Sequence, residues 1–139
     1  MTLERIRIVL VNTTHPGNIG GVARAMANMG LNHLYLVGPQ RFPSTEATVR
    51  AAGADHLLER AIVCESLDDA VADCGLVVGT TARQRSVGSV ELPPNAVMSK
   101  VRERISTDQI AFVFGREASG LTNSELERCQ YHVRIPVEE

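Results

Sequence analysis

An arginine and a glutamate stand side by side on a glycine-flanked turn, where residues 114–126 read FGREASGLTNSEL. The apolar run before this turn predicts a buried strand, so Arg116 and Glu117 would lie just beyond its carboxyl end. Loops held on a rigid sheet often carry binding and catalytic residues. Further along, Thr122 and Glu125 match the capping box of a helix start. That cap accounts for Thr122 and Glu125, and it leaves Arg116 and Glu117 as candidates for chemistry.

A second candidate site follows the first predicted strand, in the sequence THPGNIGGVARAM of residues 14–26. Asn18 is expected to cap a helix there, and Gly20 and Gly21 to let that helix pack close to the sheet. Arg24 is a lone charge among small and apolar residues, which most simply is a surface charge. A cation near a helix start gains nothing from the macrodipole, however, which suggests another use.

A third candidate is GTTAR, residues 79–83, which closes another apolar run. Thr80, Thr81 and Arg83 fit a turn with local hydroxyl–backbone bonds. They fit equally well the rim of a pocket that binds a polar ligand. The motif alone does not separate these two interpretations.

Several other kinds of chemistry are disfavoured. The histidines are His15, His33, His56 and His132, and the cysteines are Cys64, Cys74 and Cys129. The histidines are far apart and lack carboxylates at ligand spacing, so no metal is expected; His15 could touch a ligand, and His33 and His132 are expected to be structural. The unpaired cysteines are expected to be small buried hydrophobic residues. No G-x-S-x-G signature is present, and the glycine order matches neither a dinucleotide fold nor a P-loop.

The elements that must position these residues alternate between strands and helices. Strands are expected at residues 5–12, 33–37, around 62, 76–79, 109–114 and 131–135. Helices are expected at residues 18–29, 45–52, 67–72, 93–105 and 122–128, with residues 80–92 irregular. This order predicts an α/β fold with a mostly parallel sheet flanked by helices. Ligands of such sheets bind beyond the carboxyl ends of the strands, which here selects the loops 12–18, 38–42, 80–85 and 115–121.

Composition sets wider bounds. The 139 residues favour one domain with a real core. A hydrophobic content of 44% and a charged content of 22% are typical of a soluble globular protein. No apolar run is long enough for a membrane span and the N-terminus lacks a signal-peptide pattern, so a cytoplasmic location and no membrane contact are expected. Because the formal net charge is −2, contact with a nucleic acid would need a local arginine cluster or a basic segment outside these residues.

Taken together, residues 6–39, 76–85 and 112–136 resemble the SPOUT (trefoil-knot) RNA methyltransferases, most closely the TrmJ-type tRNA 2′-O-methyltransferases. The resemblance implies one catalytic domain over residues 1–139 with the SPOUT α/β-knot fold. The family's third motif, a serine-leucine-asparagine turn that threads the knot and completes the cofactor pocket, is missing from this chain. The domain is therefore expected to be incomplete at its C-terminus.

The resemblance also implies an activity. It is methyl transfer from S-adenosylmethionine to the ribose 2′-hydroxyl of an anticodon-loop nucleotide of tRNA, a cytidine or uridine at position 32, by a homodimer and without a metal. The residues carried over are Asn18, Arg24 and Glu117 for catalysis, Thr80, Thr81, Ala82, Gly115 and Ile135 for the cofactor, and Arg83 and Arg116 for RNA.

Roles follow for some of these residues. A ribose hydroxyl is a poor nucleophile until its proton is removed or polarised, and an arginine is a poor base at its ordinary pKa. Arg24 is therefore expected to orient the hydroxyl and a phosphate. Gly115 is expected to leave room for the cofactor, Glu117 to fix the loop or arginines of a partner, and Arg116 to meet phosphate.

Three alternatives remain open. The first is a non-catalytic module of the same fold that binds RNA or a protein, and the second is an rRNA ribose methyltransferase. The third, a flavodoxin-like or dinucleotide-binding oxidoreductase, is disfavoured by the order of the glycines.

Overall fold

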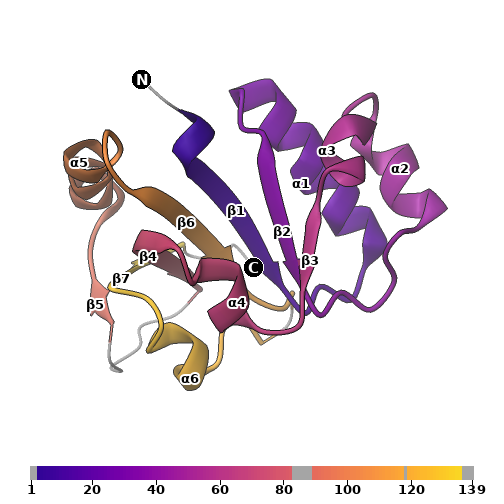
Figure 1. Ribbon diagram of the computed structural model, residues 1–139. Helices are drawn as coiled ribbons and strands as arrows, with labels where there is room; N and C mark the ends of the chain where they lie inside the picture. The colour runs from indigo at the N-terminus through magenta and orange to yellow at the C-terminus, as the bar shows by residue number, and fades with distance from the viewer. Residues whose placement is uncertain (1–2, 83–88, 118, 136–139) are drawn as a thin grey trace.

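A single parallel sheet forms the centre of the molecule (Figure 1). The computed structural model describes residues 3–82, 89–117 and 119–135. The strands are β1 (Ile6–Val11), β2 (His33–Val37), β3 (Ile62–Cys64), β4 (Cys74–Thr81), β5 (Val90–Glu91), β6 (Gln109–Phe114) and β7 (Tyr131–Arg134). They form a seven-stranded sheet in the order β3-β2-β1-β6-β4-β7-β5, and each neighbouring pair is parallel. The predicted α/β class with a mostly parallel sheet is confirmed.

Helices cover both faces of this sheet (Figure 1). The helices are η1 (Leu3–Arg5), α1 (Pro16–Met29), α2 (Thr45–Ala51), α3 (Asp55–Glu59), α4 (Leu67–Val71), α5 (Pro94–Arg104) and α6 (Asn123–Leu126). On one face, α1 packs on β1 and β2 with α2 and α3 beside it, and α5 packs on β4 and β6. On the other face lie α4 and α6. Strands buried on both faces need an apolar sequence throughout, which is why β1 reads IRIVLV.

Arg7 is the one charged residue of β1, and its side chain is buried like those of its apolar neighbours. Its guanidinium donates to the Ala70 carbonyl at 2.8 Å and to both carboxylate oxygens of Asp73 at 2.8 and 2.9 Å. It also lies 4.4 Å from the centre of the Tyr35 ring. The hydrogen bond from Arg7 lowers the pKa of the Asp73 carboxyl. Arg7 therefore ties the end of α4 to the central strand.

The first long helix begins earlier than the sequence predicts. Pro16 is its first residue and His15 is the N-cap, without a capping bond from its side chain, so Asn18 lies inside the first turn and is not the cap. Proline suits this position, because its fixed φ matches the helix and it lacks an N–H that would have no partner there. Gly30 ends the helix in the left-handed conformation at φ 76°, as expected.

Other differences concern residues 80–92, which were expected to be irregular, and one additional short helix. The strand β4 continues through Thr80 and Thr81, and β5 forms at Val90–Glu91, so residues 80–92 are not irregular throughout. The short helix α3 is not predicted from the sequence. Both short elements owe their form to neighbours, β5 to pairing with β7 and α3 to packing against α1 and β2.

The expectation that Gly20 and Gly21 let α1 pack close to the sheet is wrong. A Cβ on Gly20 would lie 2.2 Å from the Ala47 carbonyl oxygen, so Gly20 permits close approach of α2 and not of the sheet. A Cβ on Gly21 would meet nothing within 4 Å. Only one of the two glycines is needed for packing.

Candidate active site

The candidate loops meet at one edge of the sheet. The strands β1, β6, β4 and β7 are consecutive neighbours and parallel, so their carboxyl ends lie together. The hydroxyl of Thr80 donates to the Val113 carbonyl at 3.2 Å, and the backbone N–H of Ile135 donates to the Thr81 carbonyl at 2.6 Å. The predicted convergence of the loops after β1, β4 and β6 is confirmed, and the chain after β7 joins them.

Glu117 connects the loop after β6 to the loop after β1. Its carboxylate accepts the backbone N–H of Thr14 at 3.3 Å to each oxygen, and it also accepts the Thr14 hydroxyl. This contact joins residues 103 positions apart in the chain. Glu117 therefore holds the loop, which is one of the two roles expected for it.

Arg116 points into the structure of its own loop. Its guanidinium donates to the two carboxylate oxygens of Glu125 at 2.9 and 3.0 Å and to the Gly120 carbonyl at 3.2 Å. With the Asn12 amide oriented to satisfy both of its groups, the Asn12 side-chain oxygen accepts from Arg116 at 2.7 Å and its nitrogen donates to the Val37 carbonyl at 3.0 Å. Asn12 was not singled out from the sequence. Its signal is an Asn directly after a strand, a position where it tolerates the observed φ of 52°.

Arg116 and Glu125 shift each other's pKa. Burial would raise the pKa of Glu125, but the hydrogen bonds from Arg116 and from the Thr122 backbone outweigh it and the pKa is lowered. The hydrogen bond with Glu125 raises the pKa of Arg116. The predicted capping box is confirmed. The Thr122 hydroxyl oxygen accepts the Glu125 backbone N–H at 3.1 Å, and the Glu125 carboxylate accepts the Thr122 backbone N–H at 2.7 Å.

Gly115 lies where its own loop folds back against the strand end. A Cβ on Gly115 would lie 2.2 Å from the carbonyl carbon of Gly120 and 2.4 Å from the backbone nitrogen of Leu121. The backbones of Arg116 and Gly120 form an antiparallel bridge that brings the chain back over Gly115. The space beside Gly115 is therefore filled by the loop itself, and not left for a cofactor on that side.

Arg24 and Asn18 lie on the exposed surface of α1. Within the part of the chain that the structure describes, neither side chain forms a hydrogen bond or ion pair with the loops after β4, β6 or β7. Their proposed roles are thus not linked to the loop network by direct contact. Arg83 lies outside the described residues.

The threonines at the end of β4 differ from each other. The Thr80 hydroxyl donates to the Val113 carbonyl of the neighbouring strand β6, 33 positions away in the chain, so the expected local turn bond is wrong for Thr80. The Thr81 hydroxyl is buried and has no hydrogen-bond partner among the residues that the structure describes. A buried hydroxyl without a partner costs about 1–3 kcal/mol, so Thr81 has capacity for a ligand group. Ala82 and Ile135 beside it are exposed.

A second cluster of polar side chains lies at the edge of the sheet, where β7 pairs with β5. His132 is fully buried, and its Nδ1 lies 2.6 Å from the Ser89 hydroxyl oxygen. Its Nε2 lies 3.6 Å from a carboxylate oxygen of Glu91. This interior position agrees with the structural role expected for His132. His33 instead lies at the surface, 3.3 Å from the Glu4 carboxylate.

The three thiols are poorly suited to chemistry. Burial raises the pKa of Cys129 to about 12 and that of Cys74 to about 11, and it raises the pKa of Cys64 as well. A thiol with a raised pKa stays protonated at neutral pH and is a weak nucleophile. The expected burial is confirmed for Cys129, whereas Cys64 and Cys74 are only partly buried.

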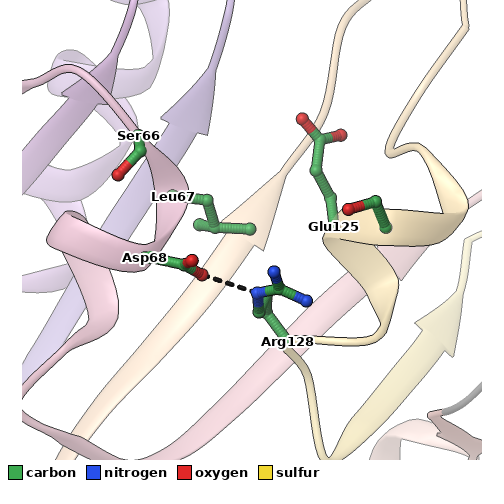
Figure 2. Close-up of a pocket in the computed structure, with 6 residues that line it drawn as sticks. Ser66, Leu67, Asp68, Glu125 and Arg128 are labelled. Atoms are coloured by element: carbon green, nitrogen blue, oxygen red, sulfur yellow. Dashed lines mark hydrogen bonds and ion pairs between the residues drawn. The ribbon is translucent and has the colours of Figure 1, made fainter.

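A shallow pocket of about 180 Å³ lies between α4 and α6 (Figure 2). Its lining residues are Ser66, Leu67, Asp68, Ser124, Glu125 and Arg128. Arg128 closes one side through a hydrogen bond of 2.6 Å to the Asp68 carboxylate. The pocket is separate from the loops at the strand ends, although Glu125 belongs to both.

Within residues 3–82, 89–117 and 119–135, no three histidine, cysteine, aspartate or glutamate side chains are grouped to hold a metal ion. In the same range no helix has the length and apolar character needed to cross a membrane.

Fold and site together define a parallel α/β protein with a polar loop cluster at the carboxyl ends of its central strands. The SpoU rRNA Methylase family matches residues 5–139, and the chain belongs to this family. It is 51% identical over 135 residues to the tRNA (cytidine/uridine/adenosine-2'-O-)-methyltransferase TrmJ of Pseudomonas aeruginosa, covering 96% of this chain and 52% of that protein. The predicted resemblance to SPOUT and TrmJ-type methyltransferases is confirmed.

Solved structures agree. A probable methylase family protein from Haemophilus influenzae Rd KW20 superimposes with a TM-score of 0.90 at 46% identity, over 99% of this chain and 57% of that chain. TrmJ from Z. mobilis ZM4 superimposes with a TM-score of 0.86 at 34% identity, over 95% of this chain and 59% of that chain. The chain thus spans slightly more than half the length of these relatives.

Proposed function

We propose that this chain, over residues 1–139, forms the catalytic domain of a tRNA 2′-O-methyltransferase. The reaction transfers a methyl group from S-adenosylmethionine to the ribose 2′-hydroxyl of an anticodon-loop nucleotide, a cytidine or uridine at position 32. The family membership and the tRNA methyltransferase names of relatives near 50% identity support it. The observation that carries the proposal is the meeting of the loops after β1, β4 and β6 at one edge of the sheet, joined by the contact of Glu117 with Thr14.

The methyl donor is proposed to bind where the ends of β4, β6 and β7 meet. The residues assigned to it are Thr80, Thr81, Ala82, Gly115 and Ile135. Thr81 supports this position because its buried hydroxyl has no partner in the described part of the chain, and the exposed Ile135 supplies an apolar surface directly beside it. Thr80 and Gly115 would contribute backbone groups, since the Thr80 hydroxyl and the space beside Gly115 are already used.

Bound S-adenosylmethionine supplies a methyl group on a sulfonium, so the reaction needs no metal. The ribose oxygen forms a bond to the methyl carbon while the bond from carbon to sulfur breaks, and the hydroxyl proton leaves to solvent. Arg24 orients the hydroxyl and a neighbouring phosphate, with Asn18 on the same helix, because its exposed guanidinium has no internal partner among the described residues. Correct orientation of two reactants accounts for a large part of such a barrier. Glu117 holds the loop that faces the donor.

RNA contact is assigned to Arg83, which would provide local positive charge on a chain of net charge −2. The RNA contact expected for Arg116 is not part of this proposal, because its guanidinium binds Glu125, Gly120 and Asn12. A homodimer, the trefoil knot of the SPOUT fold and a cytoplasmic location complete the proposal, and these follow from the family resemblance.

The test is mass spectrometry of nucleosides from tRNA and rRNA of a strain that lacks the gene. Loss of a 2′-O-methylated cytidine or uridine from tRNA, restored by the full-length protein, is the expected result. Transfer to a tRNA carrying a 2′-deoxyribose at position 32 should be absent, which makes that tRNA the matched control. Loss of a methylated ribose from rRNA alone would instead support the rRNA methyltransferase, a candidate favoured by the family's description. If no ribose methylation is lost and S-adenosylmethionine gives no heat in calorimetry, the non-catalytic module is supported.

A further inference from the structure

We propose that Arg116 and Glu125 form a positioning pair that holds residues 115–117 and 119–121 of the loop after β6 in their working shape, and that Arg116 does not contact RNA. The pair deepens the proposed function, on which it rests, by separating the arginine that shapes the site from the arginines that meet the substrate.

The first reason is the number of free donors on Arg116. A guanidinium has five N–H groups. Four are directed at Gly120, at the two oxygens of Glu125 and at Asn12, leaving only the Nε–H. A phosphate is gripped through two parallel N–H groups of the guanidinium fork, and this fork already grips Glu125.

The second reason is where the contacts of Arg116 lead. Through Gly120 the guanidinium closes its own loop, and through Asn12 it reaches the loop after β1. Glu117, the next residue, makes the other contact between these loops at Thr14. Arg116 and Glu117 thus give two parallel connections between the loops after β6 and β1, one of them fixed to α6 by Glu125.

The third reason is that Glu125 is itself firmly held. Its side chain is 16% exposed, and it accepts the Thr122 N–H at 2.7 Å as part of the capping box. The pair therefore connects the loop to the capped start of α6. Beyond the end of α6, Arg128 forms a separate, exposed ion pair with Asp68 of α4 (Figure 2).

The pair can be tested with two substitutions that spare other functions. Glu125→Gln removes the charge that Arg116 pairs with, yet a glutamine still completes a capping box. Arg116→Lys keeps a positive charge but loses the fork geometry. The control is Asp68→Asn, which breaks the exposed ion pair at the other end of α6.

In the full-length protein, Glu125→Gln and Arg116→Lys are each expected to lower kcat about tenfold while KM for tRNA changes less than about twofold. The double variant should be no worse than about the worse single variant, because both remove one interaction. Asp68→Asn should change neither constant. The proposal would be overturned by a different pair of results. These are normal kinetics of Glu125→Gln, and for Arg116→Lys a raised KM with a slope of log affinity for tRNA against log salt concentration that is smaller by about one. They would mean that Arg116 contacts phosphate.

Amide hydrogen exchange tests the pair without any methyl transfer. The Gly120 N–H donates to the Arg116 carbonyl and the Thr14 N–H to Glu117. Both amides should exchange at least several-fold faster in Glu125→Gln and Arg116→Lys than in the unsubstituted protein, and not in Asp68→Asn. Unchanged exchange in both variants would overturn the positioning role. Because this measurement needs no activity, an inactive protein would refute the proposed function and leave the pair testable.

Discussion

Two neighbouring regions of the site present an arginine in opposite conditions. In the loop after β6, Arg116 is surrounded by Glu125, Gly120 and Asn12. On α1, which follows the adjacent strand β1, Arg24 is exposed without such contacts among the described residues. In the sequence both arginines lie close to glycine, Arg116 directly after Gly115 and Arg24 three positions after Gly21. The difference teaches that an arginine's capacity for substrate depends on the N–H groups that the fold leaves unused.

The largest expected effect concerns the free arginine. Arg24→Ala should lower kcat/KM by about 10²- to 10³-fold, since it removes a group that orients the reacting hydroxyl. The thermal midpoint should stay within about 1 °C of the unsubstituted protein, because an exposed side chain contributes little to stability. Activity is measured as methyl transfer to tRNA and stability by thermal unfolding. Near-normal activity of Arg24→Ala would remove Arg24 from the mechanism, and Arg60→Ala, on an exposed residue at the end of α3, is the control.

A second prediction concerns the packing of the loop after β6. Gly115→Ala should destabilise the protein by about 2–3 kcal/mol, because its Cβ would lie 2.2 Å from the backbone of Gly120 and the loop must open to admit it. The free energy of unfolding is measured by urea denaturation. A change below about 0.5 kcal/mol would show that the loop after β6 is not as closely packed as described.

A third prediction uses the lowered pKa of Glu125. Because the pKa is lower in the folded state than in the unfolded state, the pair stabilises the fold above the ordinary glutamate pKa of about 4.3 and loses this contribution as pH falls below it. The contribution of the pair is about 1 kcal/mol, as for a partly buried ion pair with good geometry. Urea denaturation from pH 6 to pH 3 should show a shallower loss of stability in Glu125→Gln than in the unsubstituted protein. Equal slopes would contradict a paired carboxylate.

The smallest effect sharpens the comparison on α1. Gly21→Ala should stabilise the protein by about 0.5–1 kcal/mol, since a Cβ there meets nothing within 4 Å and alanine favours a helix over glycine. The matched substitution Gly20→Ala should destabilise it, because of the Ala47 carbonyl 2.2 Å from the new Cβ. Thermal unfolding of the two variants gives opposite signs if α1 packs as described. The same sign for both would refute that packing.

The sequence is most informative where contacts are local. The capping box of Thr122 and Glu125, the stop at Gly30 and the strands β2 and β6 follow from neighbouring residues and agree with the structure. The start of α1 is missed because Pro16 and Asn18 both fit a helix start, and packing decides between them. Among candidate site residues, the loop positions are predictable, but not which of their side chains remain free.

The chain by itself determined the alternation of strands and helices, and therefore that its polar loops would gather at one edge of a parallel sheet. This follows from apolar periodicity and from helix-end signals, which act over a few residues. Only the tertiary structure decided that Arg116 binds Glu125 and Asn12, that Glu117 holds Thr14, and that Arg7 pairs with Asp73. The contacts of Thr14 and Arg7 join residues 103 and 66 positions apart, which no local pattern relates, so they arise only when packing of the sheet brings those segments together.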